Sequence, residues 1–307
     1  MSSLQLYKYS GAGNDFIVLS DGVPGGSPGY DASGWSCDAS AYRDAALIGR
    51  ICDRRGGFRA ADGRTGADGL MILSLPEGGD GTARTARLPD FRMEYFNSDG
   101  SGGMMCGNGG RCIVAFADFL GLKPSAGNSF VFEAPDGLHS GEIISRQIRR
   151  CTVRLRMIDA FGLRRVLGGW FLNTGTRHFV TFVEDVEKVD VEAEGPRLRH
   201  APEFAPEGAN VNFVSPAGDG TLKIRTFEKG VEAETLACGT GITAAAIAAW
   251  YEGVPPTHNG KTRAEYLLHA RTDELSVDFI PSCRPGVGLP PAAAATDVYL
   301  TGPAERI

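Results

Sequence analysis

The sequence lacks the features that mark several specialised classes of protein. Among its 307 residues, no run approaches the ~18 consecutive apolar residues that a membrane-spanning helix needs. Basic residues are not in excess, because 31 Lys and Arg stand against 37 Asp and Glu and the net charge is −6; a nucleic-acid-binding domain is normally basic. The first residues show no basic segment followed by an apolar one, so no secretory signal is expected. We therefore expect a cytoplasmic protein that binds neither membrane nor nucleic acid.

Cysteine is present, but not in the arrangement of a disulfide framework or a metal site. Cys106 and Cys112 do not match the C-x₂₋₄-C spacing of zinc fingers, and no paired histidines follow. We expect no metal and no cofactor, and we expect Cys112 to pack inside a helix. The odd set of seven cysteines has no regular short spacing, which favours free thiols in a reducing compartment; its members are Cys37, Cys52, Cys106, Cys112, Cys151, Cys238 and Cys283.

Length and composition indicate an ordinary globular protein with more than one core. A chain of 307 residues is long for a single hydrophobic core, so two domains are expected. The apolar content of 42% and the charged content of 22% are typical of globular domains. Segments 21–36 and 76–90 are rich in Gly, Pro and Ser and are predicted to be surface loops, and segment 284–296 resembles a linker.

Two short segments of the chain are nearly the same. Met105–Gly109 and Ala237–Gly241 each contain a cysteine followed by Gly-x-Gly, and each leads into an apolar run. A thiol at the beginning of a helix is favoured as thiolate, and the free backbone N–H groups there can hold an anion. Both cysteines are therefore candidates for reactive thiols.

Hydrophobic patterning predicts many strands and few helices. Helices are expected over 39–54, 111–120 and 242–251, and the last is apolar on nearly every face, which indicates burial on all sides. Strands are expected at 4–9, 16–19, 70–75, 91–96, 129–133, 152–157, 168–172, 178–182, 222–227 and 297–301. In both halves a strand, a turn, a thiol motif and a helix follow in the same order. We predict an α+β fold of two similar domains, each a curved, mostly antiparallel β-sheet or barrel around a central buried helix.

Two matching thiols suit one kind of chemistry. Inversion at the α-carbon of an amino acid needs one group that removes the proton and a second that returns it on the opposite face. One cysteine would begin as thiolate and the other as thiol, and turnover would exchange their roles. The developing negative charge would lie among backbone donors of the two motifs; these belong to Gly107, Asn108, Gly239 and Thr240.

Seven motifs are spread, in order, from residue 9 to residue 304. They are Tyr9–Phe16, Phe96–Ser101, Met105–Cys112, Ala209–Phe213, Phe227–Gly230, Glu234–Gly241 and Val298–Ala304. In these motifs the sequence resembles diaminopimelate epimerases. The resemblance implies an isomerase that interconverts LL- and meso-diaminopimelate without pyridoxal phosphate, in lysine and cell-wall precursor biosynthesis. It also implies an N-terminal domain of residues 1–135 and 290–307 with Cys106, a C-terminal domain of residues 136–289 with Cys238, and an active site in the cleft between them.

The same resemblance assigns roles to individual residues. It makes Cys106 and Cys238 the acid–base pair. The residues it assigns to the substrate are Asn14, Asn97 and Asn210 for the distal carboxylate and amine, His178 and Glu228 near the α-amino group, and Gly107, Asn108, Gly239 and Thr240 for the α-carboxylate.

Two positions depart from the family pattern. Thr176 stands where the family has a ligand-binding Asn, and Lys229 stands where an Arg is common. Lysine keeps the charge but loses the planar fork that binds a carboxylate through two hydrogen bonds. We expect both positions on the distal side of the substrate, away from the thiols.

Three alternatives stay open at this point. A cofactor-independent racemase or epimerase of another amino acid would use the same thiols. A thiol–disulfide oxidoreductase would also need two cysteines, but the usual C-x-x-C is absent. A non-catalytic amino-acid-binding module would have no use for thiols at helix starts. In each case the partner is a small molecule, and the sequence allows a homodimer.

Overall fold

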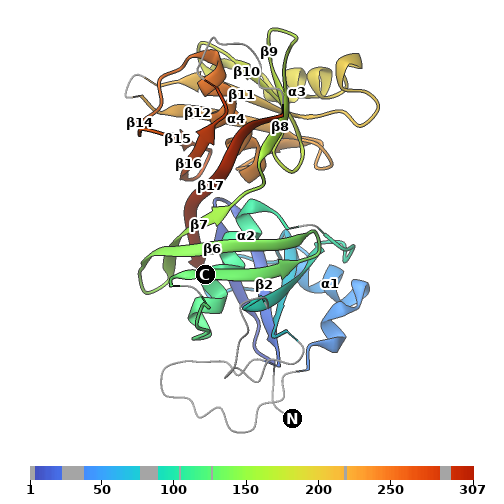
Figure 1. The fold of residues 1–307 in the computed structure, drawn as a ribbon. Helices are drawn as coiled ribbons and strands as arrows, with labels where there is room; N and C mark the ends of the chain where they lie inside the picture. The colour runs from blue at the N-terminus through green and yellow to red at the C-terminus, as the bar shows by residue number, and fades with distance from the viewer. Residues whose placement is uncertain are drawn as a thin grey trace. The chain divides into compact units, whose positions relative to one another are not determined.

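The computed structural model describes residues 4–22, 38–76, 89–103, 105–125, 127–217, 220–283 and 292–307. The chain forms two compact units, the first made of residues 1–155 and 303–307 and the second of residues 156–302 (Figure 1). Each unit is described by itself below.

Unit 1 is a closed β-sheet around helix α2, which spans Gly107–Phe119. Consecutive strands pair from β1 to β7, antiparallel except for the parallel pairs β2–β3 and β4–β5. The end of β17 pairs with both β7 and β1, which closes the sheet. Within the described residues, these strands are β1 (Tyr7–Gly11), β2 (Asn14–Asp21), β3 (Gly69–Ser74), β4 (Phe91–Asn97), β5 (Ser129–Ala134), β6 (Gly137–Arg146), β7 (Arg150–Arg156) and β17 (Ala293–Arg306).

Helix α2 begins with glycines because the space inside the sheet leaves no room for larger side chains. A Cβ on Gly110 would lie 2.9 Å from Cδ2 of Leu155, and one on Gly141 would lie 2.7 Å from Cγ2 of Val114. All α2 residues up to Ala117 are buried. This packing, rather than helix propensity, stabilises the helix.

A short helical layer covers the outside of unit 1. The 3₁₀ turn η1 (Ser40–Arg43) leads into helix α1 (Ala45–Cys52), whose N-cap Asp44 accepts a hydrogen bond from the Leu47 N–H. Ile48 and Cys52 of α1 belong to one buried apolar cluster with residues of β2 and β3.

Unit 2 repeats this design around helix α4, which spans Gly239–Glu252. Its closed sheet runs β8–β9–β10–β11–β12–β15–β16–β17 and returns to β8, with parallel pairs only at β10–β11 and β12–β15 among the described strands. The remaining bounds are β8 (Ala160–Val166), β9 (Gly169–Asn173), β10 (Arg177–Phe182), β11 (Asn210–Pro216), β12 (Leu222–Glu228), β13 (Ala233–Thr235), β14 (His258–Asn259), β15 (Ala264–His269), β16 (Glu274–Pro281), α3 (Val191–Arg199), η2 (Val186–Lys188) and η3 (Pro202–Phe204).

The two units share the order and direction of their strand pairs. In unit 1 the pairs β1–β2, β2–β3, β3–β4, β4–β5 and β5–β6 alternate antiparallel and parallel. In unit 2 the pairs β9–β10, β10–β11, β11–β12, β12–β15 and β15–β16 alternate in the same way. The repeat that the thiol motifs indicate therefore extends through each whole unit.

The structure differs from the sequence-based expectations at several boundaries. Helices α2 and α4 begin at Gly107 and Gly239, four and three residues before the expected starts. The helix expected over 39–54 is interrupted at Asp44, whose extended backbone and capping side chain begin a new helix. Most of the predicted loops 21–36 and 76–90 lies outside the described residues, as does 284–291 of the predicted linker, but 293–296 of that linker belongs to β17.

The divide between the units also differs from the expected domain boundaries at 135 and 290. It follows residue 155, and only residues 303–307 return to unit 1. The reason is that β6 and β7 complete the closed sheet around α2, where Gly141 of β6 packs against Val114 and Leu155 of β7 packs against Gly110.

Candidate functional site: two thiol-bearing helix starts

Cys106 is the N-cap residue of helix α2. Its backbone is extended, and its Sγ accepts a hydrogen bond from the Gly109 N–H at 3.2 Å. Gly109 lacks a side chain that would crowd the sulfur, since a Cβ there would lie 3.2 Å from Cys106 Sγ. An N–H donor and the positive end of a helix both favour the thiolate form. Cys106 is half-buried.

A chain of hydrogen bonds joins the start of α2 to the turn between β1 and β2. Arg111, fully buried, donates to Asn108 Oδ1 at 2.9 Å. Asn108 Nδ2 donates to Asn14 Oδ1 at 2.6 Å, and Asn14 Nδ2 donates to Asp68 Oδ2 at 3.0 Å. Two predicted substrate ligands, Asn14 and Asn108, are thus brought together beside Cys106. We call Cys106, Gly107, Asn108, Asn14 and Asp68 the Cys106 group.

The Cys106 group is anchored by buried charges. Asp15, next to Asn14 in the sequence, is 2.6 Å from Lys8 Nζ and 2.6 Å from a guanidinium nitrogen of Arg54. Lys8 and Asp15 are almost completely buried. Arg54 also pairs with Asp68. Arg54 is therefore ion-paired, and it supports a carboxylate that holds Asn14.

Asn97 is the last residue of strand β4, and its side chain bonds to the loop that follows. Its Nδ2 donates to Ser101 Oγ at 3.0 Å, and its N–H donates to the Ser101 carbonyl at 2.9 Å. No hydrogen bond joins it to the Cys106 group in the part of unit 1 that the structure describes. Its assignment to the distal end of a substrate stays a prediction.

Cys238 is the N-cap residue of helix α4, in the position that matches Cys106. It is buried, and its Sγ lies 3.4 Å from Thr240 Oγ1. Unlike Cys106, its sulfur accepts no capping hydrogen bond from the backbone of its helix. The Thr240 carbonyl in turn accepts a hydrogen bond from the Thr174 hydroxyl at 2.8 Å, which fixes the first turn of α4 against the loop before β10.

Besides Cys238, the side chains of His178 and Thr176 contact the Thr240 hydroxyl. His178 Nε2 lies 3.0 Å from Thr240 Oγ1 and 2.8 Å from Thr176 Oγ1. The two threonine hydroxyls are 3.2 Å apart. Asn210 Nδ2 donates to Thr176 Oγ1 at 3.2 Å, so all four residues form one hydrogen-bonded set with Cys238. We call Cys238, Thr240, Thr176, His178 and Asn210 the Cys238 group.

The structure places Thr176 beside His178 and Thr240. Its hydroxyl contacts both residues, and Thr240 in turn contacts Cys238 Sγ. The reason is the parallel pairing of β10 and β11, which aligns His178 with Asn210 and holds the preceding turn over the start of α4. The assignment of Thr176 to the distal side of a substrate stays a prediction.

The two groups occupy corresponding positions in the repeat. Phe16 pairs with Gly69 across β2 and β3, and Phe179 pairs with Val211 across β10 and β11. Asp68 and Asn210 each lie one residue before these partners. Each bonds the turn residue of its own unit, Asn14 or Thr176. Asn108 and Thr240, the fourth residues of the two thiol motifs, bond the same turn residues.

Glu228 and Lys229 lie at the end of β12. The Lys229 N–H donates to Asn210 Oδ1 at 2.7 Å, which ties this turn to the Cys238 group through the backbone. Glu228 Oε2 accepts a hydrogen bond from the Thr235 hydroxyl at 2.9 Å. The Lys229 side chain is exposed, so its charge is free to meet an anion in solution.

His178 is a neutral imidazole. Burial lowers its pKa from 6.5 to about 3, because a charged imidazolium would lose its hydration inside the protein. It cannot serve as a cation toward a carboxylate near pH 7. It can hold and direct hydrogen bonds among the hydroxyls around it.

This burial predicts a pH-dependent stability. Between pH 6.5 and about pH 3 the unfolded chain binds a proton at His178 that the folded chain does not, so the free energy of unfolding falls as the pH falls. The contribution is about 1.4 kcal/mol per pH unit. Urea unfolding of wild type and His178→Gln at pH 7, 6, 5 and 4.5 should show the stability difference shrinking by that amount below pH 6. A constant difference across the series would contradict a neutral His178.

Two residues that the sequence analysis did not select take part in the hydrogen bonds of these groups. Asp68 is one, and Asn212 is another: it lies in β11, completely buried, with its Nδ2 3.1 Å from His178 Nδ1. Asn212 follows Asn210 by two residues in a strand, so both point to one face, and that spacing was the available signal. Cys112 lies in α2 and is buried, as expected, and this burial raises the pKa of its thiol.

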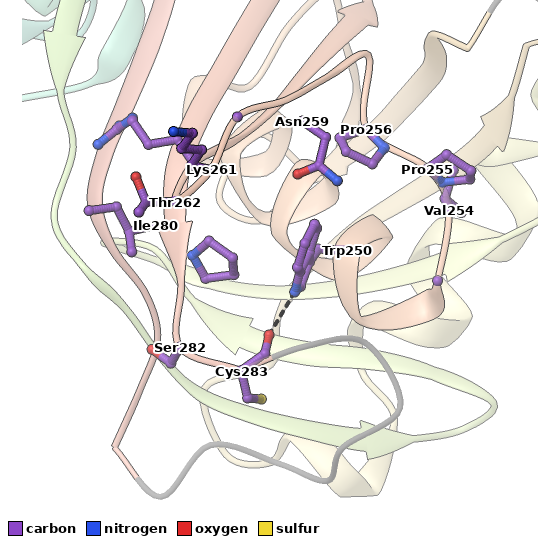
Figure 2. A pocket seen from close by; sticks show the side chains of 14 residues that line it. Trp250, Val254, Pro255, Pro256, Asn259, Lys261, Thr262, Ile280, Ser282 and Cys283 are labelled. Carbon is purple, nitrogen blue, oxygen red and sulfur yellow. Dashed lines mark hydrogen bonds between the residues drawn. The ribbon is translucent and has the colours of Figure 1, made fainter.

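A separate pocket lies at the other end of α4. Figure 2 shows Trp250 with its indole N–H directed at the Cys283 carbonyl, a hydrogen bond of 2.8 Å. Pro255, Pro256 and Lys261 also line the pocket. Trp250 comes twelve residues after Cys238 in the sequence, and a helix rises ~1.5 Å per residue. The pocket is therefore distinct from the Cys238 group.

The described residues contain no group of three His, Cys, Asp or Glu side chains arranged to hold a metal ion. Among the same residues, no helix has the length and apolar content for crossing a membrane.

Proteins named diaminopimelate epimerase match the chain along almost its whole length. The diaminopimelate epimerase of Flavobacterium psychrophilum is 35% identical over 305 residues, which cover 99% of this chain and 98% of that protein. The diaminopimelate epimerase of Aquifex aeolicus is 34% identical, with 99% and 96% covered. The chain belongs to the diaminopimelate epimerase family. The family profile, described as Diaminopimelate epimerase, matches residues 170–274, which include Cys238. As a member of this family the chain is an isomerase, which confirms the enzyme class expected from the sequence.

Solved structures show that the epimerase family fold is shared more widely. A phenazine biosynthesis protein of the PhzF family from Bacillus anthracis matches with a TM-score of 0.63 at 13% identity, covering 100% of this chain and 98% of that one. A hydroxyproline epimerase from Agrobacterium vitis matches with a TM-score of 0.60 at 17% identity, covering 99% and 89%. These likenesses confirm the predicted α+β fold.

Proposed function

We propose that the protein converts LL-diaminopimelate to meso-diaminopimelate with Cys106 and Cys238 as its acid–base pair. The observation that carries the proposal is the repeat: each unit presents one cysteine as the N-cap of its central helix, with a matched hydrogen-bonded group beside it. Family membership supports the substrate, since the relatives that cover the whole chain are diaminopimelate epimerases.

The chemistry balances with two thiols and no further reactant. One cysteine, as thiolate, takes the α-proton, so an S–H bond forms as the C–H bond breaks. The electron pair moves into the α-carboxylate, whose growing charge is stabilised by backbone N–H groups at the helix starts. The other cysteine, as thiol, gives its proton to the opposite face. The pair ends with its protonation states exchanged, ready for the reverse reaction.

The roles of the remaining residues follow from their groups. The N–H groups of Gly107, Asn108, Gly239 and Thr240 would bind the α-carboxylate at the helix starts. We assign the distal carboxylate and amine to Asn14, Asn97 and Asn210, with the exposed ammonium of Lys229 as a point charge toward the distal carboxylate. Glu228 would accept a hydrogen bond from an amino group. From this biosynthetic role we infer a cytoplasmic location, where thiols stay reduced.

Deuterium exchange tests this proposal. LL-diaminopimelate is incubated with the protein in D₂O without added cofactor, and the α-carbon is followed by NMR and chiral chromatography. We expect meso product that carries deuterium at the inverted centre. The same assay on a panel of other amino acids tests the alternative substrate: turnover of another amino acid, with LL-diaminopimelate untouched, would overturn the assignment but keep the two-thiol chemistry.

Oxidation gives a second prediction. If both thiols reach one carbon, mild oxidant should join Cys106 to Cys238 and abolish activity until a reductant is added. Peptide mapping would identify the bond, and Cys151→Ser would serve as the control that leaves it intact. If both thiols remain free after oxidation while the protein stays folded, the result would contradict a mechanism in which both act on one carbon.

A further inference from the structure

The orientation of the Asn212 amide is determined by its neighbours. Its Nδ2 lies 3.1 Å from the Phe179 carbonyl oxygen, and its Oδ1 lies 3.0 Å from the Thr226 hydroxyl. A carbonyl oxygen only accepts hydrogen bonds, so the atom facing Phe179 must be the amide nitrogen. The amide oxygen then accepts from Thr226. Asn212 is completely buried, and Thr226 is nearly so.

This orientation determines which nitrogen of His178 carries the proton. The second N–H of Asn212 meets His178 Nδ1 at 3.1 Å, so Nδ1 accepts a hydrogen bond and carries no hydrogen. A neutral imidazole has one N–H. In His178 that hydrogen is therefore on Nε2, which faces Thr176 and Thr240.

The hydroxyls beyond His178 then have one consistent direction. The single Nε2 hydrogen of His178 has Thr176 Oγ1 as its nearer acceptor, at 2.8 Å against 3.0 Å for Thr240 Oγ1. With that donation, and with the one from Asn210 Nδ2 at 3.2 Å, both lone pairs of Thr176 Oγ1 are used. Its own hydrogen is directed to Thr240 Oγ1, 3.2 Å away. The Thr240 hydrogen is left for Cys238 Sγ at 3.4 Å. Each donor in the chain points toward the sulfur.

We propose that Asn212 is a positioning residue: it fixes His178 as the Nε2–H tautomer and thereby directs the Thr240 hydroxyl to donate to Cys238. A donor of this kind stabilises a thiolate. It supplies to Cys238 what the Gly109 N–H supplies to Cys106. The importance of Cys238 rests on the proposed function, but the tautomer of His178 does not.

The tautomer can be observed without any substrate. Two-bond ¹H–¹⁵N NMR distinguishes a protonated from a bare imidazole nitrogen, and His178→Gln assigns the signals among the five histidines. Near pH 7 we expect the wild-type protein to show one tautomer, with Nε2 protonated. In Asn212→Leu, which keeps the volume but removes the amide, we expect a second population with Nδ1 protonated. Wild type with Nδ1 protonated would overturn the proposal.

A second measurement reports on the sulfur. Alkylation of Cys238 by iodoacetamide, followed peptide by peptide at pH 7, should be about tenfold slower in Asn212→Leu, since a hydrogen bond to a charged group is lost. Ser215→Ala is the matched control: it removes a buried polar group from the same strand β11, with a contact to the Val186 N–H rather than to His178. It should leave both the tautomer and the alkylation rate unchanged.

A third variant keeps the test independent of folding. If circular dichroism shows that Asn212→Leu is unfolded, Thr226→Val removes only the hydroxyl that holds the Asn212 oxygen. It should shift the tautomer population in the same direction by a smaller amount. Unchanged tautomer and alkylation in a folded variant would refute the role of Asn212. Loss of diaminopimelate turnover in wild type with the tautomer as expected would refute only the proposed function.

Discussion

Replacing either Cys106 or Cys238 by serine should lower the rate of LL-to-meso conversion by about 10³-fold, within the range for loss of a general acid or base. A serine hydroxyl is far harder to deprotonate than a thiol, and each cysteine must act as base in one direction and as acid in the other. In the proposed mechanism neither thiol can substitute for its partner, because each serves a different face of the α-carbon. The conversion is measured by chiral chromatography of the product.

The two variants should differ in the isotope exchange that they retain. A variant with one thiol can still remove and return a proton on its own face, so it should exchange deuterium into one stereoisomer without inverting it. The other variant should exchange the other stereoisomer. Cys151→Ser, which removes a half-buried thiol outside both motifs, should stay within about twofold of wild type. Equal exchange of both stereoisomers by each single variant would contradict a two-base mechanism.

The helices that carry the thiols were visible in the sequence, but their starts were not. Gly107, Gly109 and Gly110 have low helix propensity, so the pattern predicts a start at Arg111. In the structure these residues are helical and buried, and a Cβ on Gly110 would lie 2.9 Å from side-chain atoms of both Leu155 and Met105. Tertiary packing outweighs local propensity at the positions that the chemistry needs.

The closed sheets could be predicted only in part. Strands with continuous apolar runs, such as β3, were found close to their observed bounds. Strand β8 was missed because its sequence carries two arginines, Arg164 and Arg165, and alternates poorly. Its place in the sheet depends on pairing with β17, more than a hundred residues away. Such long-range pairing has no local signal in the sequence.

The sequence contains no local signal for the directions of the hydrogen bonds in the candidate site. The motifs select Asn14, Asn108 and Thr240, which the structure places in two hydrogen-bonded groups. They do not show that Asp68 and Asn210 occupy equivalent positions, because this depends on the parallel registers of β2–β3 and β10–β11. The sequence identifies the candidate thiols, and strand register decides which polar groups lie beside them.

Asp15→Asn should cost about 3–5 kcal/mol of unfolding free energy, the effect of leaving a buried charge without its partner. The Lys8 ammonium is completely buried and lies 2.6 Å from the Asp15 carboxylate, with the Arg64 carbonyl as a further acceptor at 3.4 Å. A neutral amide would leave that charge uncompensated. Urea unfolding measures the loss. Asp62→Asn, which breaks an exposed ion pair with Arg64, is the matched control and should cost less than about 1 kcal/mol.

A double variant isolates the cause of this loss. Lys8→Met removes the buried charge while it keeps the apolar stem, so the combination of Lys8→Met with Asp15→Asn should be more stable than Asp15→Asn alone. The remaining defect would then be the freedom of Arg54 and Asp68 beside Asn14. Diaminopimelate turnover by the double variant would consequently show a raised KM with a smaller change in kcat. If the double variant is instead less stable than Asp15→Asn, the cost arises from lost packing around β1 and β2 and not from an unpaired charge.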